Sequence, residues 1–206
     1  RNLPNTAEDI PASAFEENTR HWKDRFSGIT EMHGSENPYA LHSELADAMI
    51  SNVLIVRENA KLEATIKTIG DIESRWKDID CVDTQDWNNP VPSFINQLWN
   101  MIQLSKIITM GAVKRDEFRG SHYKPAFDLK QPEDFNPAYY LEFEEQKANG
   151  GVRKEQFSKE HLDYMERFEK NNDNWLKSSI ATYNDGKPEI SYEGVDTSLI
   201  PPRPRK

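Results

Sequence analysis

The sequence lacks several features that common classes of function require. It contains one cysteine, Cys81, in 206 residues, and a single thiol excludes an internal disulfide, a cysteine-ligated zinc site and an iron–sulfur cluster. We therefore expect a reducing compartment. The flanking Asp80 and Asp83 should raise the pKa of the Cys81 thiol and make it inert. No apolar run approaches the roughly 20 residues that a membrane-spanning helix needs, and no signal peptide opens the chain, so we expect no direct membrane insertion.

An excess of positive charge is also lacking. The chain has 26 Lys and Arg against 35 Asp and Glu, a net charge of -9, which argues against a nucleic-acid partner because phosphate binding depends on clustered cations. The five histidines show no spacing of four residues, so no metal site is predicted. No G-x-G-x-x-G segment is present, and we predict no cofactor bound by this chain. The hydrophobic share of 36% favours helices over a buried parallel sheet.

What the sequence does contain is apolar residues at helical spacing, which predict four helices in the first 118 residues. The first is an amphipathic helix over 11–29. The second begins at the N-cap candidate Asn37 and runs to Val56, and the third covers 62–79 with one narrow apolar stripe. After a loop over 80–92, the fourth covers 94–113 and is expected to be central and buried on most sides, apart from a polar stripe of Asn96, Asn100, Gln103 and Lys106.

Beyond Arg119 the prolines become frequent and no helical period is sustained. Ser158 is an N-cap candidate for a short helix, and two apolar runs at 180–183 and 190–192 flank Asn184-Asp185-Gly186, which is typical of a β-hairpin turn. The fold class predicted is mainly α, with a spectrin-repeat-like three-helix bundle followed by a small α+β segment with a β-hairpin. The predicted parts are a linker and helix over 1–36, the bundle over 37–118, and a C-terminal domain over 119–206 with an extended, proline-rich tail.

Three segments of the chain resemble one family of enzymes. They are Leu54-Ile55-Val56-Arg57 at the predicted end of the second helix, Glu117-Phe118-Arg119-Gly120-Ser121-His122 after the fourth helix, and Asn172-Asp173-Asn174-Trp175 before the hairpin. In this order they resemble the last third of the flavoprotein subunits of succinate dehydrogenase and fumarate reductase. The resemblance covers roughly residues 40 to 206.

The resemblance implies a parent that interconverts succinate and fumarate by hydride transfer to or from FAD. It places the FAD domain and the catalytic residues upstream of this chain, so we expect no catalytic residue here and leave open whether the chain alone counts as an enzyme. The chain starts with Arg1 rather than Met, as a fragment does. The partners implied are the FAD domain of the same chain and the iron–sulfur subunit, and the location implied is cytoplasmic, at the inner face of the membrane through partner subunits.

Seven residues are interdomain or near-site candidates in this interpretation. A helix-ending turn with an Arg and a His could reach a carboxylate or a facing domain, while the simpler interpretation is a helix C-cap with Gly120 at positive φ and Arg119 favoured by the helix dipole. We favour a structural role at the contact with the FAD domain. The alternative for the whole chain is a stand-alone helical protein-protein interaction module. The candidates are Arg57, Asn100, Glu117, Arg119, Gly120, His122 and Trp175.

Overall fold

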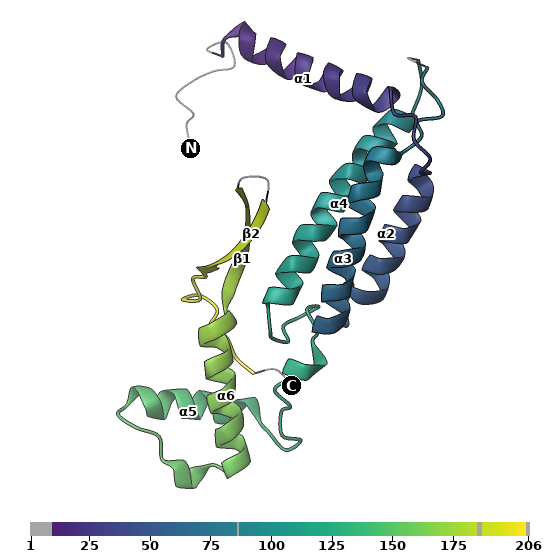
Figure 1. Ribbon diagram of the computed structural model, residues 1–206. Coiled ribbons are helices and arrows are strands. Elements are labelled where there is room, and N and C mark those ends of the chain that lie inside the picture. Colours follow the sequence, from purple (N-terminus) through teal and green to yellow (C-terminus); the bar gives the residue numbers. More distant parts are fainter. Residues whose placement is uncertain (1–9, 86, 185–186, 205–206) are drawn as a thin grey trace. The chain divides into compact units, whose positions relative to one another are not determined.

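The computed structural model describes residues 10–85, 87–184 and 187–204 (Figure 1). Six α-helices and one two-stranded antiparallel sheet make up its regular structure. The prediction of a mainly α fold with a C-terminal β-hairpin is thereby confirmed. The elements are α1 (Ala12–Thr30), α2 (Pro38–Asn52), α3 (Asn59–Arg75), α4 (Val91–Lys114), α5 (Pro137–Ala148), α6 (Lys159–Trp175), β1 (Lys177–Asn184) and β2 (Lys187–Gly194), with short 3-10 turns at Trp76–Asp78, Pro125–Phe127 and Lys154–Gln156.

The chain forms two compact units. The first consists of residues 1–51 and 65–106, and the second of residues 52–64 and 107–206. Among the described residues, no helix combines the length and the apolar character that crossing a bilayer requires.

The core of the first unit is the bundle of α2, α3 and α4. The Asn37 side chain caps α2 as predicted, because its Oδ1 accepts from the backbone N–H of Tyr39 at 2.9 Å. The predicted stripe of the third helix is buried, and Trp76 donates its indole N–H to the backbone oxygen of Ile95 on α4 at 3.1 Å. Burial of these side chains away from water is what holds the three helices together. The core contains Ile29, Leu41, Leu45, Ile69, Ile72, Ile79, Cys81, Ile95, Leu98 and Ile102.

The prediction that α4 is buried on most sides is wrong. In a bundle of three, each helix has two neighbours and keeps an outward side, and Leu104 is 58% exposed on that side of α4. The predicted polar stripe is not uniformly solvated either. Asn96 is buried and accepts from Arg25 Nε of α1 at 2.7 Å, and Gln103 donates to Glu73 of α3 at 2.8 Å.

The second helix is also shorter than predicted. It ends at Asn52, and the chain then extends so that Ile55 accepts from the Tyr123 N–H at 3.3 Å while the Arg57 N–H donates to the Tyr123 oxygen at 2.8 Å. Val56 and Tyr123 form a parallel bridge. Consecutive β-branched residues favour this extended backbone over another helical turn.

The core of the second unit lies between α5 and α6. Ser158 caps α6 as predicted, since its Oγ accepts from the His161 N–H at 3.1 Å. The sequence analysis missed α5, although Asn136 as N-cap and Pro137 at the first helical position form a recognised start signal. The core is aromatic, with Phe135, Tyr140, Phe143, Tyr164 and Met165 buried.

The hairpin pairs β1 with β2 in the antiparallel register that runs from Lys177 opposite Gly194 to Asn184 opposite Lys187. The two predicted strands are therefore confirmed. Residues Asp185 and Gly186 of the predicted turn lie outside the described residues.

Candidate functional site

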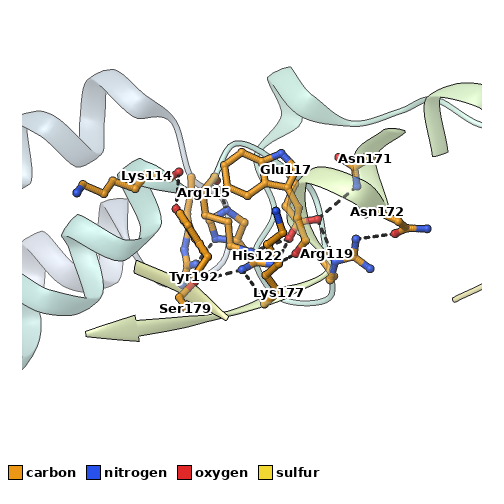
Figure 2. Close-up of polar contacts among 12 residues, drawn as sticks. Lys114, Arg115, Glu117, Arg119, His122, Asn171, Asn172, Lys177, Ser179 and Tyr192 are labelled. Carbon is orange, nitrogen blue, oxygen red and sulfur yellow. Dashed lines mark hydrogen bonds and ion pairs between the residues drawn. The ribbon is translucent and has the colours of Figure 1, made fainter. Parts of the chain in front are cut away.

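The segment that follows α4 carries a buried carboxylate between two arginines (Figure 2). Glu117 is fully buried. Its Oε1 accepts from Arg115 Nε at 2.6 Å and its Oε2 from Arg119 Nε at 2.9 Å. An ionised carboxylate away from water needs such partners, because the cost of removing it from water is otherwise several kcal/mol. Arg115, Glu117 and Arg119 are spaced two residues apart, and both guanidinium groups bond to the carboxylate between them.

Arg115 connects the end of α4 to the C-terminal strands. Its Nη1 donates to the backbone oxygen of Lys177 at 2.9 Å and to Ser179 Oγ at 3.1 Å, and its Nη2 donates to the backbone oxygen of Trp175. The guanidinium also lies 5.9 Å from the centre of the Trp175 ring, within the range of a cation–π contact. One side chain therefore binds the C-terminal end of α6 and the beginning of β1.

Arg119 makes the corresponding contact with α6. Its Nη2 donates to Asn172 Oδ1 at 2.9 Å, and the neighbouring Asn171 donates its Nδ2 to Glu117 at 3.3 Å. Asn172 is buried. The last turn of α6 is therefore bonded to both the carboxylate and one of its arginines.

His122 bonds with both of its ring nitrogens. Nε2 lies 2.8 Å from the backbone oxygen of Arg115, and Nδ1 lies 2.5 Å from Nη1 of Arg57. A guanidinium only donates and a carbonyl only accepts, so the imidazole is neutral with its proton on Nε2. Burial, followed by the positive charges of Arg57 and Lys124, lowers the pKa of His122. The neutral form is therefore the one that this environment favours.

Arg57 is fixed by the extended segment that ends α2. Its Nε donates to the backbone oxygen of Val53 at 2.7 Å and its Nη2 to that of Leu54 at 3.3 Å. Burial lowers the pKa of its guanidinium. The contact with His122 therefore links residues 53–57 to the turn after α4.

That turn is a two-residue hairpin rather than a helix cap. The N–H of Arg119 donates to the His122 oxygen at 3.0 Å, and the N–H of His122 donates back to the Arg119 oxygen at 3.1 Å. Gly120 has φ +60°, so the predicted positive φ is confirmed, but α4 has already ended at Lys114. Glycine at the first central position is what such a turn needs. The predicted helix cap at Gly120 is wrong because the R-x-E-x-R segment leaves the helix early.

The second unit thus brings together six of the seven candidates: Arg57, Glu117, Arg119, Gly120, His122 and Trp175. The Trp175 ring packs edge-on against Tyr192 at 5.7 Å, and the Tyr192 hydroxyl donates to the backbone oxygen of Lys114 at 2.9 Å. Asn100 belongs to the first unit, where its side chain is exposed on α4.

Several residues of the cluster were missed. Arg115 could have been found from its alternation with Glu117 and Arg119. Lys124 had no such signal, although it is buried and donates to Asp116 at 2.9 Å and to the backbone oxygen of Val113 at 3.1 Å. Asn171 and Tyr192 gave no signal in the sequence either. Asn172 lies in one of the three resembling segments but was not selected as a candidate. The roles of all three side chains depend on contacts between residues more than 50 positions apart.

Chemically, this arrangement holds segments of the chain together through hydrogen bonds and ion pairs. We call the four residues Arg115, Glu117, Arg119 and His122 the joint. The carboxylate faces two guanidinium groups and the imidazole is bonded on both sides, which is unlike a nucleophile paired with a free base. Within residues 10–85, 87–184 and 187–204, no group of three His, Cys, Asp or Glu side chains is placed to hold a metal ion.

Comparison with known proteins gives the chain its family. Residues 42–206 match the family described as fumarate reductase flavoprotein C-term. The chain is 35% identical over 205 residues to the succinate dehydrogenase flavoprotein subunit of Bacillus subtilis, covering 98% of this chain and 28% of that relative. It is 22% identical over 200 residues to the fumarate reductase flavoprotein subunit of Haemophilus influenzae, covering 97% of this chain and 27% of that relative.

A solved structure agrees with this at the level of the fold. A chain of Escherichia coli quinol fumarate reductase superposes with a TM-score of 0.67 at 19% identity, over 96% of this chain and 27% of that one. The chain thus spans little more than a quarter of the length of the relatives that it matches from end to end. This chain belongs to the fumarate reductase flavoprotein C-terminal family.

Proposed function

We propose that the chain is the C-terminal part of a succinate dehydrogenase or fumarate reductase flavoprotein subunit, and that it supports the FAD domain of that subunit by packing against it. The observation that carries the proposal is the match, at 35% identity over 98% of this chain, to one succinate dehydrogenase flavoprotein subunit. The parent carries FAD upstream of this chain and interconverts succinate and fumarate by hydride transfer. The chain itself supplies no catalytic group.

We assign the parts of the chain within the flavoprotein by the boundaries expected from the sequence. Residues 1–36 form the helix and linker that leave the FAD domain, 37–118 the helical bundle, and 119–206 the C-terminal domain. The joint of Arg115, Glu117, Arg119 and His122 supports this function because it fixes the turn at Gly120 from two sides. Arg57, Asn100 and Trp175 complete the set proposed for the interdomain contact.

The partners and the location follow from the same assignment. The parent passes electrons to an iron–sulfur subunit, and it sits on the cytoplasmic side of the membrane, held there through partner subunits. No nucleic acid takes part. The alternative, a stand-alone interaction module, requires that no flavin-binding region share the polypeptide.

The test is to express the complete reading frame that contains this chain and to measure bound FAD and succinate-dependent dye reduction. We expect one polypeptide that carries FAD and turns over. Arg119→Gln and His122→Gln should lower flavin retention, whereas Glu145→Gln, an exposed side chain on α5, should not. A reading frame without a flavin-binding region would overturn the proposal and leave the interaction module.

A further inference from the structure

The loop that follows α5 contains an asparagine with a glycine directly after it. Asn149 is the C-cap of α5, with φ −90° and ψ 15°, and it is the one asparagine in the sequence that precedes a glycine. Gly150 and Gly151 have φ +108° and +147°, in the region that glycine adopts without strain. All three residues are exposed, and a Cβ at Gly150 would meet nothing within 4 Å. The Asn149 amide therefore lies in water beside a backbone nitrogen that no side chain shields.

Few bonds restrain this amide and the nitrogen next to it. Asn149 donates its backbone N–H to the Glu145 oxygen at 3.1 Å, whereas its side chain makes no hydrogen bond within the part of the chain that the structure describes. The Gly150 N–H donates to the Lys147 oxygen at 3.4 Å, which is longer than the usual value of about 3.0 Å. A small movement of the loop is therefore enough to bring the two groups together.

The buried asparagine of the second unit is held very differently. Asn172 keeps 8% of its surface exposed, and its Oδ1 accepts from Arg119 at 2.9 Å. Asp173 follows it, so the nitrogen next to this amide carries a side chain. Asn172 therefore provides an internal reference for the chemistry at Asn149.

We propose that Asn149 is a modification site at which the chain itself supplies the attacking group. The backbone nitrogen of Gly150 forms a bond to Cγ of Asn149, the bond from Cγ to the side-chain nitrogen breaks, and ammonia leaves with the proton of the backbone nitrogen. Water then opens the five-membered ring at one of its two carbonyl groups and gives aspartate or isoaspartate. The sum is one water taken up and one ammonia released, without a cofactor. The inference does not depend on the proposed function.

The product alters the connection between α5 and α6. A carboxylate at position 149 lies at the C-terminal end of α5, where the helix dipole disfavours negative charge, and four residues after Glu145. Isoaspartate also adds a methylene to the backbone before the Gly151 N–H, which donates to the Gln146 oxygen at 3.1 Å. Gln146 is buried, and its Oε1 accepts from the Arg153 N–H at 2.8 Å. The reaction therefore loosens a loop that a buried glutamine organises.

The test follows Asn149 in the complete polypeptide that contains this chain, incubated in its folded state at mildly alkaline pH. Peptide mass spectrometry measures the conversion of each asparagine amide to an acid and separates aspartate from isoaspartate. A synthetic peptide of residues 146–152 is incubated in parallel, so that the reaction is also measured without the fold. Asn149 should react at least about tenfold faster than Asn172, which becomes accessible only by local opening, and isoaspartate should be among the products.

The matched control is Asn149→Gln, which keeps an amide but lengthens its side chain by one methylene, so that the five-membered ring cannot form. It should leave position 149 without isoaspartate. Hydrogen exchange at the Arg153 N–H should accelerate in the incubated protein and stay unchanged in the incubated variant.

Three results would overturn the assignment. An intact Asn149 after an incubation that converts the peptide means that the fold prevents ring closure. Conversion of Asn172 at the same rate means that the reaction belongs to the unfolded chain. Aspartate at position 149 without isoaspartate means direct hydrolysis of the amide, in which the Gly150 nitrogen takes no part.

Discussion

The Nδ1 atom of His122 lies 2.5 Å from the Nη1 atom of Arg57. This contact is compatible only with a neutral imidazole, because a protonated ring would place two cations against each other. It therefore makes the joint after α4 sensitive to pH.

Stability should fall as the pH is lowered below about 6.5. Burial and nearby positive charge hold the pKa of His122 below its ordinary value of 6.5 in the folded chain, so the unfolded chain binds the proton more readily. The contribution is present above pH 6.5 and is lost as the pH falls through the folded pKa. Urea denaturation between about pH 8 and about pH 5 should show a shallower pH slope for His122→Gln. His21→Gln, at an exposed position on α1, should keep the original slope, and an unchanged slope for His122→Gln would contradict this assignment.

Removing the charge of Glu117 should destabilise the second unit. Glu117→Gln leaves two guanidinium groups without their counter-charge, and because Arg115 and Arg119 keep 15% and 35% of their side-chain surface exposed, we expect a loss of about 2–3 kcal/mol, at or below the low end for a buried pair. Chemical denaturation measures it. Glu145→Gln should cost less than about 0.5 kcal/mol as a surface change. A comparable loss in both variants would show that the carboxylate does not depend on its arginines.

Two glycine substitutions should have opposite signs. Gly120→Ala places a Cβ at φ +60° and should cost about 1–2 kcal/mol. Gly70→Ala lies inside α3, where an added Cβ meets nothing within 4 Å, and should stabilise by about 0.5–1 kcal/mol. The midpoints of thermal unfolding report both. Equal shifts would indicate that the turn tolerates a side chain.

Cys81 should remain unreactive while the chain is folded. Burial, and then the charges of Asp83 and Asp80, raise the pKa of the thiol, which confirms the expectation from its acidic neighbours. The thiolate fraction and the access to it are both low. Labelling with a thiol reagent near neutral pH should wait for unfolding and accelerate when urea is added. Rapid labelling without denaturant would mean that the bundle opens around residues 79–81.

The sequence was sufficient for elements whose apolar residues repeat with a regular period. The apolar stripe over 62–79 predicted the third helix. Four of its members are buried and two are half-buried: Leu62, Ile69, Ile72 and Ile79 against Ile66 and Trp76. The end of α2 was predicted too far along the chain, because Val53 and Val56 continue a helical spacing while the backbone at Val56 pairs instead with Tyr123. Periodicity reports which side of an element is apolar, and it does not report a competing strand partner.

The sequence predicted only part of the candidate site, again because a sequence pattern does not show contacts between distant residues. Glu117, Arg119 and His122 were found through resemblance, but Arg115 and Lys124 were not, and neither was the pairing of Arg57 with His122. The contact of Arg115 with Glu117 is local. Its contact with Lys177, 62 positions away, and that of Arg57 with His122, 65 positions away, join residues that are brought together only by the fold. Local pattern contains no information about them, whereas N-caps such as Asn37 and Ser158 act within three residues and were predicted correctly.

The contacts of Arg115 with residues far along the chain determine when it can form its hydrogen bonds during synthesis. Its acceptors at Trp175, Lys177 and Ser179 lie 60, 62 and 64 residues further along the chain. The bundle helices α2, α3 and α4 all precede Arg115 and can pack as they emerge, since domains fold in N-to-C order on the ribosome. The hydrogen bonds from Arg115 to Lys177 and Ser179 cannot form until the ribosome has synthesised β1. A stop codon placed before Ser179 would therefore remove a hydrogen-bond acceptor of Arg115, which lies 64 residues upstream of it.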